Sequence, residues 1–218
     1  MKRRPLPLAA AMTACVALLL TACSDGSNDS NAKDTIAGAD TGDAETSASP
    51  STSPAETAQR PEVSLPSDLR TVFDDWKTGD ATKDALLADV QGAQTATDYA
   101  VTQGSTKEPA ISFYYRDDAL ITTTQWVQSF IDKGLTITGE IRYYDPQVTL
   151  SSDTAGSVRY CSDESKAFSK VRKTSEINRT AVTDDSFVLY NVKVEKNKQG
   201  VWQTTNGISA RGNKACTP

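Results

Sequence analysis

The spacing of apolar residues divides the chain into three parts. Residues 5–22 form a short apolar run, whereas the stretch up to residue 61 carries almost no large apolar side chain. Further along, apolar positions recur regularly and the aromatic residues gather. We therefore predict a signal peptide at 1–22, a linker at 23–61 that is too polar to bury a core, and one domain at 62–218.

Helical spacing dominates the first half of this domain. Apolar residues three or four positions apart predict a helix over 67–79 and a second helix over 82–102, with Gly104 as its C-cap. A third helix is expected over 123–133. The intervening stretch 110–116 fits either a helix or a strand.

After Gly134 the period changes to the alternation of a half-buried strand. Residues 137–150 predict one strand, 157–162 a second and 187–196 a third, and a fourth contains Trp202. Helices followed by an antiparallel meander predict an α+β domain, in which the N-terminal helices pack on one face of a curved antiparallel sheet.

Cys23 ends the first apolar run, which is shorter than a membrane-spanning helix requires. The order Leu20-Thr21-Ala22-Cys23 resembles the bacterial lipobox. This resemblance implies cleavage before Cys23 and attachment of diacylglycerol to its thiol, and two acyl chains are enough for stable anchoring. We expect a lipoprotein on the outer face of the bacterial cell membrane, bound to the membrane through this lipid. An ordinary secretory signal or a retained signal anchor is the alternative.

Two cysteines remain in the predicted domain, Cys161 and Cys216. In an oxidising compartment such a pair favours a disulfide bond. Metal binding by the two thiols is the alternative, and no further cysteine accompanies them.

The composition removes several classes of function. The chain has no histidine, and 28 acidic residues outnumber 23 basic ones. Catalytic triads with histidine, cysteine–histidine pairs and histidine-bound zinc are therefore excluded, and the charge does not favour nucleic acid as a partner. No catalytic, cofactor-binding or metal-binding residue is predicted.

Five parts of the predicted domain match a known sequence pattern: Leu135–Gly139, Asp145–Thr149, Tyr160–Ser165, Gly200–Trp202 and the terminal Cys216. In these parts the chain resembles a family of secreted bacterial lipoproteins of unknown function with a nuclear transport factor 2-like (SnoaL-like) cone fold. The resemblance implies a cone fold over 66–218 and pairing of the two cysteines. Isomerases and dehydratases on this fold place His, Asp or Tyr inside the cavity, so the absence of histidine counts against such an activity.

The favoured hypothesis is a non-enzymatic domain that binds a protein partner or a small apolar ligand. Aromatic side chains line apolar pockets, although they also dominate cores. The candidate pocket residues are Tyr114, Trp126, Phe130, Tyr143, Tyr160 and Trp202. A homodimer formed through the sheet is a third hypothesis.

The alternative is an enzyme that uses Asp145, Asp163 or Glu164 as a general base, with Tyr143 or Tyr160 as proton donor. An apolar cone raises the pKa of a carboxyl group through desolvation, as a general base requires. Asp145 is explained more simply as a turn residue before proline, and Asp163-Glu164 as the exposed end of a strand.

Overall fold

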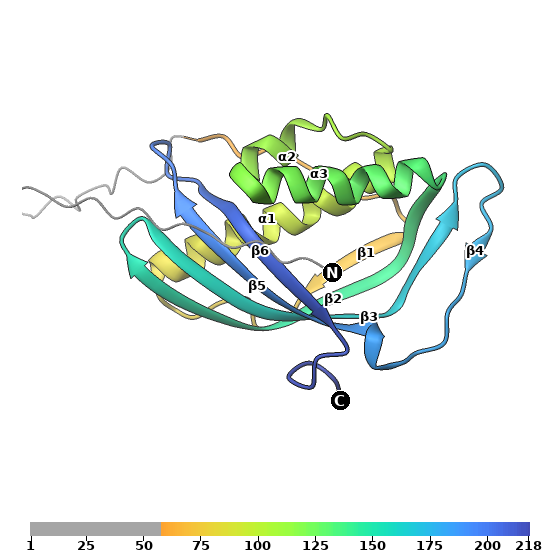
Figure 1. Cartoon of the computed structure of the whole chain (residues 1–218). Coiled ribbons are helices and arrows are strands. Elements are labelled where there is room, and N and C mark those ends of the chain that lie inside the picture. Colours follow the sequence, from red (N-terminus) through yellow and green to blue (C-terminus); the bar gives the residue numbers. More distant parts are fainter. Residues whose placement is uncertain (1–57) are drawn as a thin grey trace, which may run out of the picture. The chain divides into compact units, whose positions relative to one another are not determined.

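Three helices cover one face of a curved six-stranded sheet in the computed structural model of the protein (Figure 1). The structure describes residues 58–218, which form one compact unit. The predicted signal, the lipidation at Cys23 and nearly all of the linker lie outside these residues. Within the described part of the chain, no helix is both long and apolar enough to cross a membrane.

The sheet has the strand order β1-β2-β3-β5-β6, and the short β4 pairs with β3. The strands are β1 (Leu69–Phe73), β2 (Leu135–Ser152), β3 (Ala155–Val171), β4 (Ile177–Asn178), β5 (Phe187–Lys196) and β6 (Trp202–Arg211). The helices are α1 (Ala81–Gln103), α2 (Pro109–Tyr114) and α3 (Asp117–Asp132), with a short 3₁₀ turn, η1 (Asp184–Ser186). The predicted α+β class, with helices on one face of a curved sheet, is confirmed.

The first predicted helix, 67–79, is wrong, because this segment contains the strand β1. It pairs in parallel with β2, Leu69 lying opposite Gly139 and Phe73 opposite Tyr143. A short isolated helix is only marginally stable, whereas the free edge of β2 supplies backbone hydrogen-bonding partners along Leu69–Phe73. The sheet is therefore mixed, not purely antiparallel as predicted.

Helix α1 confirms the predicted helix over 82–102 to within one residue at each end. The Asp80 side chain caps its start by accepting hydrogen bonds from the backbone N–H groups of Thr82 and Lys83 at 2.9 and 3.0 Å. Gly104 ends the helix in the left-handed conformation, with φ at 65°, which glycine adopts without strain. The local sequence thus determines both ends of the helix.

The other predicted helices and strands are present, and several are longer than the sequence pattern predicted. The third predicted helix is α3, which begins six residues before residue 123, at Asp117. The ambiguous stretch 110–116 is helical as far as Tyr114, where α2 ends. Strand β5 has the predicted bounds. The predicted short strand 157–162 lies in the first half of the 17-residue β3.

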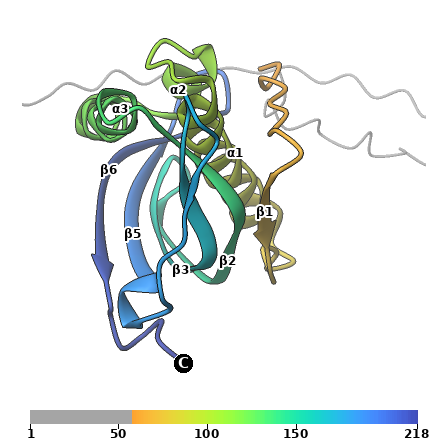
Figure 2. The ribbon, with the colours of Figure 1, turned by 90° about the vertical axis from the view of Figure 1, so that its right-hand side faces the viewer.

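The long strands β2 and β3 bend, which makes the sheet concave beneath the helices (Figure 2). Their register shifts between Glu140 and Arg142 and again between Tyr144 and Gln147, as β-bulges do. Before the first bulge, Gly139 has φ at 100°, and a side chain there would clash with the Lys166 carbonyl group. The bend therefore depends on glycine at this position.

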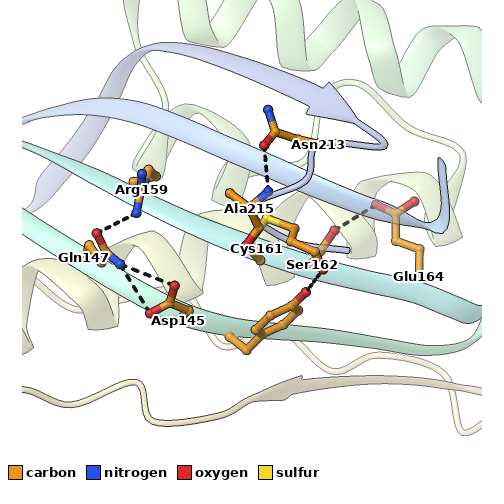
Figure 3. Close-up of a disulfide and its surroundings, with 10 residues drawn as sticks. Asp145, Gln147, Arg159, Cys161, Ser162, Glu164, Asn213 and Ala215 are labelled. Carbon is orange, nitrogen blue, oxygen red and sulfur yellow. Dashed lines mark hydrogen bonds between the residues drawn. A yellow bond between two sulfur atoms is a disulfide. The ribbon is translucent and has the colours of Figure 1, made fainter. Parts of the chain in front are cut away.

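The predicted disulfide between Cys161 and Cys216 is confirmed, with the two Cα atoms 5.6 Å apart. It ties the C-terminus to the middle of β3 (Figure 3). The Tyr144 hydroxyl also donates a hydrogen bond to the Cys216 carbonyl oxygen. The covalent link thus holds the C-terminal segment beside β3.

Candidate functional site

A cavity of about 630 Å³ lies between the helices and the concave face of the sheet. Side chains from α1, α3 and strands β2, β3, β5 and β6 line it. Apolar and aromatic groups make up much of the wall, and a few polar groups face the same space. This combination is typical of sites for small molecules.

Three of the six candidate pocket residues line this cavity: Trp126, Phe130 and Tyr143. Trp126 and Phe130 come from one turn of α3, and their ring centroids lie 4.8 Å apart. Trp126 keeps 41% of its surface exposed, as Ile208 of β6 keeps 69%. Because both residues also line the cavity, they mark its open side.

The other three candidates, Tyr114, Tyr160 and Trp202, do not line the cavity but are buried in the core. The Tyr160 ring stacks on Tyr190 with centroids 5.1 Å apart, and Gln94 Nε2 donates a hydrogen bond to its hydroxyl at 2.7 Å. Composition cannot separate core aromatics from cavity aromatics, because the neighbouring helix decides which rings are covered.

Asp98 of α1 is a buried charged residue of the cavity that the sequence analysis did not identify. Only 3% of its surface is exposed, and the Thr71 hydroxyl donates a hydrogen bond to its carboxylate at 3.3 Å. Burial raises the pKa of Asp98 to about 7, and the nearby Glu164 carboxylate adds to the rise. The signal was present in the sequence, since Asp98 lies three residues before Val101 and beside Thr97 on the apolar stripe of the predicted helix.

Glu164 also lines the cavity, although it was predicted at the exposed end of a strand. It lies within β3, and only 21% of its side chain is exposed. Arg211 of β6 forms an ion pair with it at 2.7 Å, and the Ser162 hydroxyl donates a hydrogen bond to its other oxygen at 3.2 Å (Figure 3). The prediction failed because β3 continues well past residue 162 and carries Glu164 into the concave face.

The other two candidate bases lie outside the cavity lining. Asp145 is exposed at a β-bulge with φ at 51°, where Gln147 donates hydrogen bonds to its carboxylate. Asp163 accepts a hydrogen bond from the Ser165 backbone N–H group at 2.9 Å. Since Glu164 faces the cavity, the alternation of β3 directs its neighbour Asp163 to the opposite face.

Tyrosine hydroxyl groups add neutral hydrogen-bonding atoms close to Asp98. The Tyr143 hydroxyl donates to Gln94 at 3.2 Å, and the Thr97 hydroxyl donates to Tyr115 at 2.9 Å. Burial raises the pKa values of Tyr115, Tyr143 and Tyr190. These phenols therefore stay protonated at neutral pH and bring no charge to the site.

Metal binding finds no support among residues 58–218, where no group of three acidic, cysteine or histidine side chains could hold an ion. No protein-family model and no curated protein matches the sequence.

Several solved structures are similar to the chain. One is the intermembrane space region of the chloroplast protein ARC6, with a TM-score of 0.40 and 15% identity over 62% of this chain and 99% of that one. A ketosteroid isomerase-like protein from Erwinia carotovora atroseptica has a TM-score of 0.38 and 16% identity, over 57% of this chain and 94% of that one. An NTF-2-like protein of unknown function from Shewanella oneidensis has a TM-score of 0.35 and 16% identity, over 56% and 96%. Such low values assign neither an activity nor a ligand to this chain.

Proposed function

We propose that this protein is a lipid-anchored extracytoplasmic binding protein whose cavity holds a small, largely apolar ligand. The observation that carries the proposal is the cavity of about 630 Å³ beneath α3, open beside Trp126 and Ile208. A space of this size accommodates a drug-sized molecule. The aromatic wall supplies the apolar contact, and neutral tyrosine hydroxyls nearby supply hydrogen bonds without adding charge.

The binding step is tested by filling the cavity from α3. Thr123 lines the cavity, whereas Gln125 is exposed and is not among the lining residues. A soluble chain of residues 24–218 contains all of the described core. Native mass spectrometry reports a bound ligand, and the fluorescence of an added probe reports its affinity. We expect Thr123→Trp to weaken the binding of an uncharged apolar probe, N-phenyl-1-naphthylamine, at least about tenfold, and the matched Gln125→Trp to leave its affinity unchanged. Equal affinities in the two variants would place the ligand elsewhere.

The anchor is tested separately in cells. Labelled palmitate should enter the wild-type chain but not Cys23→Ala, and the variant should leave the membrane fraction. Lipid incorporation that survives this substitution would exclude Cys23 as the anchor. Homodimerisation through the sheet remains a prediction, which light scattering on residues 24–218 tests.

A second candidate function is general-base catalysis, and Asp98 is the observation that favours it. A buried carboxylate with a pKa of about 7 can exchange a proton with a bound carbon acid near neutral pH. Asp98 takes the role that the sequence analysis gave to Asp145, Asp163 or Glu164. Incubation of a co-purified ligand with the protein in D₂O should then incorporate deuterium into the ligand, and Asp98→Asn should abolish the exchange. Exchange that persists in this variant would exclude Asp98 as the base.

A further inference from the structure

We propose that the cavity selects hydrophobic organic cations, with a quaternary or protonated ammonium group seated beside Asp98. This inference rests on the proposed binding function and names the chemical class of its ligand. It is carried by the balance of charges in the cavity and by the aromatic rings that share the space.

The charged groups that line the cavity do not balance. They are two carboxylates, Asp98 and Glu164, and one guanidinium, Arg211. Arg211 is already engaged, because it pairs with Glu164 at 2.7 Å and donates to the Asp185 carbonyl oxygen at 3.0 Å. Within residues 58–218, Asp98 forms no ion pair, and its hydrogen bond comes from the uncharged Thr71. An ionised Asp98 therefore leaves one negative charge uncompensated in a largely apolar space.

The aromatic lining favours the same ligand. Trp126 and Phe130 from α3, with Tyr143 and Tyr190 from the sheet, line the cavity that Asp98 also lines. The faces of such rings carry negative partial charge and attract ammonium groups, more strongly where water is excluded. Rings with a nearby carboxylate are the arrangement by which proteins recognise quaternary ammonium ions.

An anionic ligand fits less well. Its carboxylate or phosphate would have to displace Glu164 from Arg211 and would also meet the carboxyl group of Asp98. A cation relieves both effects that raise the pKa of Asp98, since it replaces lost solvation and screens Glu164. Cation binding should therefore lower this pKa.

Other titratable groups surround Asp98 from every packed element. They are Tyr115 from the α2–α3 connection, Tyr143 from β2, Tyr160 and Glu164 from β3, Tyr190 from β5 and Arg211 from β6. Burial holds the tyrosines neutral, and Arg211 stays charged. Between pH 5.5 and 8, Asp98 is thus the group whose charge changes most.

The experiment compares two probes of nearly equal shape on residues 24–218 by calorimetry. Benzyltrimethylammonium carries a permanent charge, and neopentylbenzene is its uncharged carbon analogue. Because the cation itself does not titrate, any pH dependence comes from the protein. We expect it to bind at least about tenfold more tightly than the neutral analogue at pH 8, with a preference that falls several-fold by pH 5.5 as Asp98 is protonated.

Two variants assign the preference to its residue. Asp98→Asn should bring the two probes to nearly equal affinity at every pH, whereas the exposed Asp145→Asn, an identical chemical change, should keep the wild-type preference. Retained binding of neopentylbenzene by Asp98→Asn shows that its cavity is folded.

The outcomes separate the two proposals. If neopentylbenzene binds as tightly as the cation, or if Asp98→Asn keeps the preference, cation selection is overturned while apolar binding stands. If neither probe binds to the wild-type protein, both proposals are overturned.

Discussion

Helix α1 carries two buried carboxylates nine residues apart, and their surroundings differ sharply. Asp89, with no exposed surface, accepts hydrogen bonds from Arg60 Nε and Nη2 at 2.7 and 3.1 Å and from the Trp202 backbone N–H group at 2.9 Å. Asp98, with 3% of its surface exposed, has the Thr71 hydroxyl at 3.3 Å and faces the cavity. Burial is thus shared by both residues, and only the partners distinguish them.

This difference separates a structural carboxylate from a candidate functional one. A buried charge is tolerated when a cation and donors satisfy it, and around Asp89 these partners join the start of the described chain to α1 and β6. A buried carboxyl group without a cation responds by shifting its pKa. The Asp98 carboxylate therefore has no cation beside it among the described residues, and a positively charged ligand can supply one.

The strongest test of this contrast is removal of the Asp89 charge. Asp89→Asn breaks this ion pair and puts an amide where a fully buried carboxylate accepts hydrogen bonds from Arg60 and from the Trp202 N–H group, so we expect the free energy of unfolding to fall by about 3 kcal/mol. Urea unfolding at pH 7 measures it, with the exposed turn variant Asp153→Asn as control. A loss no larger than that of the control would remove the distinction between the two carboxylates.

The same substitution at Asp98, Asp98→Asn, should instead raise the free energy of unfolding. Asp98 has a pKa of about 7 in the folded protein, against an ordinary value of 3.8 for the side chain of aspartate. Between these values the folded state binds more protons than the unfolded state, so the contribution of Asp98 to stability falls as pH rises from about 4 to 7. Asp98→Asn should match the wild type near pH 4 and exceed its free energy of unfolding by on the order of 2 kcal/mol at pH 8.

Urea unfolding of both proteins across this pH range checks the prediction. Subtracting the two curves cancels the contributions of other carboxyl groups. A difference that does not grow with pH would show that Asp98 is ionised without penalty.

Packing around the Asp89 half of α1 gives a smaller test. A Cβ atom at Gly92 would lie 2.5 Å from the ring of Tyr114, which is itself buried. Gly92→Ala should therefore lower the unfolding free energy by about 1–2 kcal/mol despite the better helix propensity of alanine. The exposed neighbour Gln91→Ala should change it little, and thermal unfolding of both variants compares them.

The smallest expected effect concerns the hydrogen bond between Thr71 and Asp98. That bond lowers the pKa of Asp98 against the effect of burial, so Thr71→Val should raise the pKa by less than about one unit. Carbon-13 NMR of the Asp98 carboxyl group follows the titration directly. An unchanged midpoint would show that Thr71 does not stabilise the carboxylate.

Sequence periodicity predicted those elements whose ends are set by local chemistry. Helix α1 begins at its Asp80 cap and ends at Gly104, and β5 alternates along its whole length. Segment 67–79 was misassigned because the helical spacing of its apolar residues is a local signal, whereas its pairing with the edge of β2 is a tertiary contact that this spacing does not record. Half of the candidate pocket aromatics proved to be core for the same reason, since the neighbouring element decides whether a ring is covered.

By itself, the sequence determined the α+β class, the two long-range cysteine partners and the absence of histidine chemistry, because each depends on residue type or local spacing. The tertiary structure alone decided that the chain pairs β1 in parallel with β2 and that Asp89 meets Arg60 while Asp98 meets a cavity. Two aspartates on one helix are chemically equal until folding supplies their surroundings, and the free energy of a buried charge depends on those surroundings.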